Sequence, residues 1–458
     1  MAMTRRELLR SAGTGLGIVG LAQLLVRNGY AGSGALKTLH HPAKAKHLIF
    51  LFLNGGPSQV DTFDPKPMLA KYHGKPIPTG NLKTERKTGN ALASPFSFKR
   101  CGKSGLEVSE IFPQLGQRID EVCVIRSMWT DRSNHEPSLF MLNTGFTFNG
   151  RPSLGSWLTY GLGTENENLP GYFVLCPGLP VVGPQLWSAG FLPAAHQGTY
   201  INHGQKDPSQ LIPFLRTRGK LEDQRRQLDL LRAINLRHLE REGPDAQLEG
   251  AIAAMETAFR MQTEAPDILD LSKEDPKVRQ RYGEGDFARG CLLAARLIEK
   301  GVRMVQVYFG NLQPWDNHDD ILIHRKLAAQ ADQPIAALID DLKARGLFDE
   351  TLLIITGEFG RTPAVEVSGL VKVQNGRDHN AHGFTTLIAG AGIQGGMAYG
   401  ATDDFGFKAV QNPVHPHDLH ATILHLFGID HTRLTFRYSG RDFRLTDVEG
   451  KVITDILA

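Results

Sequence analysis

Short apolar runs alternate with longer amphipathic segments along this chain, and this alternation constrains its fold more than any other feature. Five runs rich in β-branched and aromatic residues end in glycine or polar clusters, as buried strands do: His47–Leu53, Val122–Ser127, Met304–Phe309, Thr351–Thr356 and Phe384–Ala389. Other segments repeat apolar residues at helical spacing: Asp286–Lys300, Arg325–Arg345 and Pro416–Phe427. Continuously apolar strands are buried on both faces, so we predict an α/β fold with a mostly parallel sheet sandwiched between helices.

The chain is expected to consist of a leader and one domain. Residues 1–35 contain Arg5-Arg6, an uncharged Gly/Ala/Leu-rich run and then small residues, a pattern typical of a twin-arginine export signal. The apolar run is shorter than the roughly 20 residues that span a bilayer. We therefore expect signal cleavage, no stable membrane span, and export to the periplasm or cell envelope, or secretion.

Residues 36–458 are predicted to form a single domain with one insertion. The charged segment 219–262 is expected to be an inserted helical hairpin, and Gly163–Gly204, rich in proline and glycine, a long loop layer. The 51 Lys+Arg nearly balance the 48 Asp+Glu, which argues against nucleic acid as a partner. The four cysteines lack CxxC spacing, so neither a disulfide scaffold nor a thiolate zinc site is expected. The oligomeric state stays open.

Polar clusters flank the predicted strands, where open α/β sheets bind their ligands. Aspartate, glutamate and histidine recur there, and these residue types hold zinc and other divalent ions. Taken singly, each cluster is equally compatible with a hydrogen-bonded or salt-bridged loop. Their recurrence at one edge of the sheet predicts a metal site, with these candidate ligands: Asp316, His318, Glu358, His379 and His382. A guanidinium fork matches a bidentate oxyanion, so Arg361 is the candidate anion binder, with Arg377 as the alternative.

Several of these segments resemble the exported proteins called "domain of unknown function 1501". The resemblance runs from about Lys46 to the C-terminus and is carried by LFLNGGPSQVDTFDPKP, RQRYGEGDFARGCLLAARLIEKGVRMVQV, WDNH, TGEFGRTP and GRDHNAHG. That family is similar to sulfatases and is placed in the alkaline phosphatase–sulfatase superfamily. The resemblance implies an alkaline-phosphatase-like fold and a centre of one or two divalent ions (zinc, calcium or manganese) that hydrolyses phosphate or sulfate esters.

The resemblance also adds residues to the candidate site. Asn54 stands where the superfamily normally has an aspartate ligand after the first strand, so the resemblance implies Asn54 as a further, weaker ligand. His135 stands where sulfatases carry the cysteine that they oxidise, which argues against a formylglycine mechanism. The attacking group is left open between His135, a serine and a metal-activated water. The serines considered are Ser58, Ser133 and Ser138.

Two functions are compatible with this sequence. The first is an exported, metal-dependent hydrolase of phosphate or sulfate esters, acting on a small molecule or on glycans and other envelope polymers. The second is a non-catalytic exported binding protein that retains the sulfatase-like fold, which the missing cysteine, Asn54 and Phe359 favour.

Overall fold

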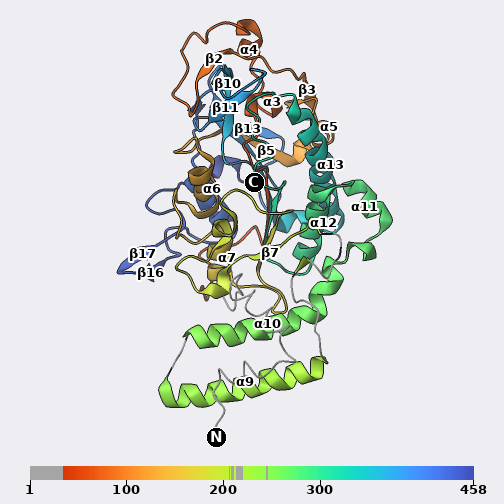
Figure 1. Cartoon of the computed structure of the whole chain (residues 1–458), viewed down its shortest axis with the longest axis vertical. Helices are drawn as coiled ribbons and strands as arrows, with labels where there is room; N and C mark the ends of the chain where they lie inside the picture. Colours follow the sequence, from red (N-terminus) through yellow and green to blue (C-terminus); the bar gives the residue numbers. More distant parts are fainter. Residues whose placement is uncertain (1–34, 206, 208–210, 213–219, 244–245) are drawn as a thin grey trace.

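An eight-stranded sheet in the order β13-β5-β12-β9-β1-β8-β6-β7 forms the centre of the molecule (Figure 1). The computed structural model describes residues 35–205, 207, 211–212, 220–243 and 246–458, so the predicted export signal, apart from Ala35, lies outside the described residues. The strands of this sheet are β1 (His47–Phe52), β5 (Val122–Met128), β6 (Tyr172–Leu175), β7 (Thr199–Ile201), β8 (Met304–Tyr308), β9 (Thr351–Thr356), β12 (Phe384–Ala389) and β13 (Met397–Tyr399).

Most neighbouring strands of the sheet are parallel, and β12 is the exception. β1 pairs in parallel with β8 and β9, and β6 pairs in parallel with β7 and β8. β12 runs antiparallel to both of its neighbours, β5 and β9. β1, β8 and β9 are buried along their whole length, as their continuously apolar sequences predict. The predicted α/β fold with a mostly parallel sheet is confirmed.

Helices cover both faces of the sheet (Figure 1). Ile49 and Leu51 of β1 pack into a core with α12 (Asp286–Glu299) and α13 (Ile323–Ala344). Leu48, Phe50 and Phe52 of the same strand point to the other face. That face is covered by α6 (His135–Thr144), α7 (Leu154–Leu162) and α14 (Pro416–Leu426). The alternation along β1 thus produces two separate cores, one on each side of the sheet.

The remaining elements lie around this core. The charged segment 219–262 is occupied by α9 (Leu221–Glu242) and α10 (Ala246–Leu269), which lie side by side at one end of the molecule (Figure 1). The smaller elements are α4 (Pro67–Tyr72), α5 (Pro113–Gly116), α11 (Pro276–Tyr282), β3 (Phe98–Cys101), β4 (Leu106–Ser109), β14 (Ala401–Thr402), β15 (Ala409–Gln411), β16 (Phe436–Tyr438) and β17 (Arg441–Phe443). Among the described residues, no helix combines the length and apolar character that crossing a bilayer requires.

The segment Gly163–Gly204 differs from the predicted long loop. It contributes β6 and β7, and β6 pairs with β8 from Tyr172 to Leu175. These strands have four and three residues, too few for hydrophobic periodicity to distinguish them from a loop. Long-range pairing therefore decides their place in the sheet: β6 pairs with β8, and β7 pairs with β6.

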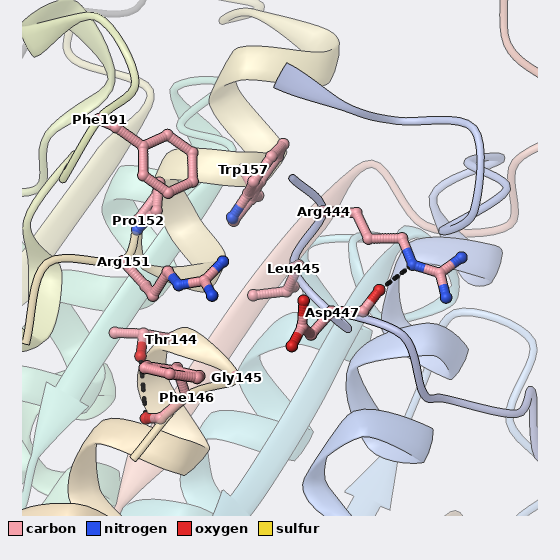
Figure 2. Close-up of a pocket in the computed structure, with 10 residues that line it drawn as sticks. All are labelled: Thr144, Gly145, Phe146, Arg151, Pro152, Trp157, Phe191, Arg444, Leu445 and Asp447. Atoms are coloured by element: carbon pink, nitrogen blue, oxygen red, sulfur yellow. Dashed lines mark hydrogen bonds between the residues drawn. The ribbon is translucent and has the colours of Figure 1, made fainter. Parts of the chain in front are cut away.

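The C-terminal segment packs against the ends of α6 and α7 (Figure 2). Gly145 ends α6 with φ of 67°, and a Cβ there would lie 2.1 Å from the carbonyl oxygen of Leu445. Arg151, which lines the small pocket in Figure 2, has its guanidinium carbon 4.4 Å from the ring centroid of Phe146 and 4.3 Å from that of Phe443. This packing fixes the C-terminal end of α6, opposite to the end where His135 lies.

A small antiparallel sheet, β11-β10-β2, lies at one end of the molecule, with strands β2 (Thr88–Ala91), β10 (Gly360–Glu366) and β11 (Arg377–Asn380). A buried ion pair attaches it to α3 (Gln59–Thr62), the helix that follows β1. Arg377 Nε and Nη2 donate to the two carboxylate oxygens of Asp61 at 2.7 and 3.1 Å. Burial opposes ionisation of Asp61, but the charge and hydrogen bonds of Arg377 outweigh it and lower the pKa of Asp61.

We expect Asp61→Asn to destabilise the protein by about 3 kcal/mol at pH 7, because it leaves the buried Arg377 charge unpaired. Since the pKa of Asp61 is lowered by folding, its contribution is present above the ordinary carboxyl pKa and is lost as the pH falls below it. Urea denaturation at pH 7 and in steps below pH 4 measures both effects. A double variant, Asp61→Asn with Arg377→Met, should recover part of the loss. A loss below about 1 kcal/mol in the single variant would contradict this role.

Candidate metal centre

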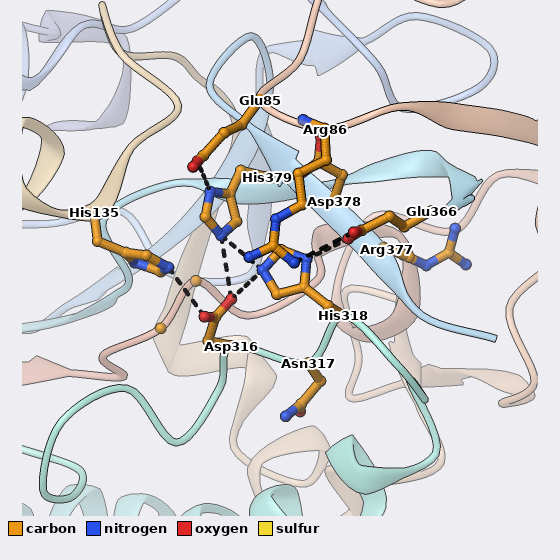
Figure 3. A network of polar contacts seen from close by, with 12 residues as sticks. Glu85, Arg86, His135, Asp316, Asn317, His318, Glu366, Arg377, Asp378 and His379 are labelled. Carbon is orange, nitrogen blue, oxygen red and sulfur yellow. Dashed lines mark hydrogen bonds and ion pairs between the residues drawn. The ribbon is translucent and has the colours of Figure 1, made fainter. Parts of the chain in front are cut away.

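Three imidazoles converge on the carboxylate of Asp316 (Figure 3). Asp316 Oδ1 lies 2.8 Å from Nε2 of His318 and 3.2 Å from Nε2 of His379, and Asp316 Oδ2 lies 3.4 Å from Nε2 of His135. We call these four residues the Asp316 cluster. They come from the loop after β8, from β11 and from the first position of α6. The fold therefore assembles this cluster from three distant parts of the chain.

Each imidazole of the Asp316 cluster has a carboxylate behind it. Nδ1 of His135 lies 2.7 Å from Glu358, and Nδ1 of His379 lies 2.7 Å from Glu85. Nδ1 of His318 contacts Glu366. An imidazole that donates its Nδ1–H to a carboxylate presents Nε2 as an acceptor, which is how proteins orient histidine ligands of metal ions. The same arrangement occurs three times around one carboxylate.

The spacing within the Asp316 cluster suits a bound cation. Nε2 of His318 and Nε2 of His379 are 3.1 Å apart, so two acceptor nitrogens face each other. Nε2 of His135 is buried and makes no hydrogen bond within the described residues. Ligand atoms held tetrahedrally at about 2.0 Å from an ion lie about 3.3 Å apart. Three nitrogens and one carboxylate match zinc or manganese better than calcium, which takes oxygen ligands.

The balance of charge around the cluster also favours a bound cation. Arg361 Nη2 donates to Asp316 Oδ1 at 2.7 Å. Burial opposes the negative charge of Asp316, but the charge of Arg361 outweighs it and holds the pKa of this carboxyl far below its ordinary value. Four carboxylates belong to the cluster or contact its imidazoles, and two guanidinium groups contact these carboxylates. With neutral imidazoles, the site therefore has an excess of two negative charges. The four are Glu85, Asp316, Glu358 and Glu366, and the two are Arg86 and Arg361.

A second group of potential ligands adjoins the first. Atoms of His318, Glu366 and Asp378 lie within 4.8 Å of one another. Asp378 Oδ1 is buried without a hydrogen-bond partner among the described residues, while Oδ2 accepts the backbone N–H of Arg86 at 2.7 Å. Arg86 Nη1 lies 3.3 Å from Glu366 and already neutralises it. A cation in this second group would compete with the guanidinium, so the Asp316 cluster is the better site for an ion.

The structure brings together Asp316, His318 and His379 of the predicted ligands, and it places the others elsewhere. Both carboxylate oxygens of Glu358 accept the Gly55 N–H, at 3.0 and 3.1 Å, and Oε1 also contacts His135, so Glu358 orients that imidazole. The Asn54 amide is buried and hydrogen-bonds the backbone of the loop after β8. His382 Nε2 lies 3.3 Å from the carbonyl oxygen of Lys83. Backbone groups thus occupy the Asn54 amide, and His382 is in neither ligand group.

The predicted catalytic residues are also distributed differently from the sequence-based prediction. His135, predicted as a nucleophile, is part of the Asp316 cluster. Arg361, predicted to bind an anion, is fully buried and donates to Asp316 and to backbone carbonyls. The Ser58 hydroxyl is buried and donates to Asp61, away from the cluster. In this structure neither the guanidinium of Arg361 nor the hydroxyl of Ser58 is available to a substrate.

The sequence analysis missed the acidic residues behind two of the imidazoles. Glu85 lies in the loop before β2, and Glu366 is the last residue of β10. No motif or spacing marks either residue, since both reach the cluster only through the small β11-β10-β2 sheet. Beyond the cluster, a cavity of about 590 Å³ lies on another side of the loop after β8, where Phe309, Asn311 and Pro314 line it. None of the four cluster residues lines that cavity.

Fold and site together define an α/β protein with a candidate metal centre beyond the carboxyl ends of its strands. The chain belongs to the family DUF1501, described as a protein of unknown function, whose sequence profile matches residues 45–457. The resemblance found in the sequence is thereby confirmed. No curated protein sequence matches this chain.

Solved structures of low similarity include a lipoteichoic acid synthase, a sulfatase and a protein in the alkaline phosphatase superfamily. The lipoteichoic acid synthase LtaP from Listeria monocytogenes is 12% identical, with 93% of this chain and 80% of that chain covered and a TM-score of 0.36. The PsFucS1 sulfatase from Pseudoalteromonas sp. is 13% identical, with coverages of 93% and 72% and a TM-score of 0.35. A protein in the alkaline phosphatase superfamily from Vibrio parahaemolyticus is 13% identical, with coverages of 91% and 75% and a TM-score of 0.33. At these scores, the chemistry of the site rests on this chain's own residues.

We expect His379→Ala and Asp316→Ala to abolish stoichiometric binding of a divalent ion, since each removes an atom at the point of convergence. His382→Ala is the matched control: the same substitution three residues further along should leave metal content unchanged. Elemental mass spectrometry after dialysis, with circular dichroism as a check of folding, measures this. Metal loss in His382→Ala together with retention in His379→Ala would reverse the assignment of ligands.

Glu358→Gln should weaken metal affinity about 10- to 100-fold without abolishing it, because Glu358 orients His135 rather than converging on the centre. Competition with a zinc chelator of known affinity gives the dissociation constant of each variant. Complete loss of binding would show that Glu358 is itself a ligand, as the sequence predicts.

Proposed function

We propose that this protein is an exported, metal-dependent hydrolase of phosphate or sulfate esters. The observation that carries the proposal is the convergence of three Nε2 atoms on Asp316, with a carboxylate behind each imidazole. The twin-arginine pattern of residues 1–35 is the basis for export. Glycans and other envelope polymers are the substrates that an exported protein would meet, with small-molecule esters as the alternative.

The residues of the Asp316 cluster would hold one divalent ion, and zinc and manganese fit the donor set best. When bound, such an ion acts as a Lewis acid toward an ester oxygen and lowers the pKa of water. The chain positions that chemistry through its own residues. Phe359 packs against His135 and His379, with centroid distances of 4.8 and 4.5 Å, and excludes water from that side. Asp316 has a side chain 21% exposed, so the ester would enter from its side of the cluster.

Water is the attacking group that these surroundings favour. The Ser58 hydroxyl is buried against Asp61, and the Ser138 hydroxyl donates to the carbonyl oxygen of Arg132 at 2.7 Å. Ser133 is the remaining serine of the three: its carbonyl oxygen lies 2.6 Å from Nδ1 of His379. If water attacks directly, Ser133→Ala should retain ester hydrolysis.

Hydrolysis of p-nitrophenyl phosphate, p-nitrophenyl sulfate and bis-p-nitrophenyl phosphate tests the proposal with zinc- or manganese-loaded protein. We expect turnover that disappears on chelation and returns with the ion, that falls at least 100-fold in Asp316→Asn, and that persists in His382→Ala. Loss of one charged ligand removes both metal affinity and charge at the reacting group.

A metal-loaded protein that hydrolyses neither these aryl esters nor sulfated and phosphorylated polymers would overturn the proposal. It would favour the non-catalytic binding protein, which the engagement of Arg361 by protein groups supports. Ser133→Ala without activity, in protein that still holds its ion, would instead identify a serine nucleophile.

A further inference from the structure

Two arginines contact carboxylates of the candidate centre, and they differ in how many of their N–H donors are engaged by the described residues. Arg361 is fully buried, and its donors go to Asp316 and to backbone carbonyls, including those of Gly55 and Gly56. The side chain of Arg86 is 29% exposed. Within the described residues its guanidinium makes a single hydrogen bond, from Nη1 to Glu366 Oε1 at 3.3 Å. Nε and Nη2 of Arg86 therefore have donors available.

The backbone around Arg86 is fixed to the same site. The Arg86 N–H donates to Asp378 at 2.7 Å, and its carbonyl oxygen accepts the Thr84 hydroxyl at 2.9 Å. The preceding residue, Glu85, contacts Nδ1 of His379. Figure 3 shows the side chain of Arg86 extending from this loop toward His318. These contacts fix the backbone of Arg86, and the bond from Nη1 to Glu366 restrains its guanidinium, so less freedom is lost when the guanidinium binds a ligand.

The surroundings of Arg86 select the charge and shape of that ligand. Glu366 is shared between Arg86, His318 and the Ser368 hydroxyl, so it holds the guanidinium by one edge only. The free edge presents two parallel donors, the pattern that pairs with two oxygens of a phosphoryl or sulfuryl group. The other groups behind the cluster are carboxylates, which repel an anion. Arg86 is thus a partly exposed cation that is linked to the Asp316 cluster by Glu366, which contacts both Arg86 and His318.

We infer that Arg86 binds the non-bridging oxygens of the phosphate or sulfate group at the Asp316 cluster, the role that the sequence analysis gave to Arg361. This inference rests on the proposed function and names the residue that recognises the anionic part of its substrate. Because a guanidinium group hydrogen-bonds two oxygens at once, lysine is expected to replace the charge of Arg86 but not its geometry.

Isothermal titration of the full-length protein with inorganic phosphate and with inorganic sulfate tests this inference, with and without loaded zinc. We expect Arg86→Ala to weaken binding of at least one anion 10-fold or more, and Arg86→Lys to restore only part of the loss. Zinc content should stay at the wild-type level in both variants. Arg100→Ala, a change at an exposed arginine of β3, is the control and should bind as wild type does.

Each other outcome has a defined meaning. Zinc-loaded Arg86→Ala that binds both anions as wild type does, or wild type that binds neither, overturns the inference and leaves the metal centre standing. Equal weakening in Arg100→Ala also overturns it, because the effect would then reflect net charge. If wild-type protein takes up neither zinc nor manganese, the proposed function fails, while the titrations of metal-free protein still decide the role of Arg86. With a chromogenic ester, Arg86→Ala should raise KM more than it lowers kcat.

Discussion

The carboxylate of Asp316 is the point on which the architecture of this site depends. Its oxygens meet Nε2 of three imidazoles and one guanidinium, and these groups come from segments far apart in sequence. An ionised carboxylate in these surroundings is costly unless positive charge lies against it, and Arg361 supplies that charge. Arg361 extends the same network to the loop after β1 through the carbonyls of Gly55 and Gly56. These polar contacts therefore help to fix the loops relative to one another.

The carboxylates behind the imidazoles give the site its chemical character. Glu85, Glu358 and Glu366 orient the three rings so that their Nε2 atoms face the same point. They also leave the site with more negative than positive charge, an imbalance that a divalent ion corrects. The same acidic surroundings make an accessible guanidinium necessary if an anionic ester is to approach. Arg86 provides one at the edge of the site, so the proposed metal binding and the inferred anion recognition would share a single network.

The sequence predicted the fold well because buried strands have a local signature. The five predicted strands are present, and Thr351–Thr356 and Phe384–Ala389 have the predicted bounds. The edge of the sheet where the site lies was predicted for the same reason. Sequence does not tell the direction of β12, which runs antiparallel to its neighbours. That direction brings the start of β12, and with it His379, to the edge where the parallel strands β1, β8 and β9 end.

The sequence by itself determined the elements, their burial and the set of polar segments near the strand ends, because these depend on residue type and short-range periodicity. Only the tertiary structure decided which side chains converge. His379 and His382 are equivalent in sequence, yet one faces Asp316 and the other a backbone carbonyl. Glu358 and Glu85 both orient an imidazole, although only the first lies in a recognisable motif. Convergence depends on directions set by long-range strand pairing, and no local pattern in the sequence contains that information.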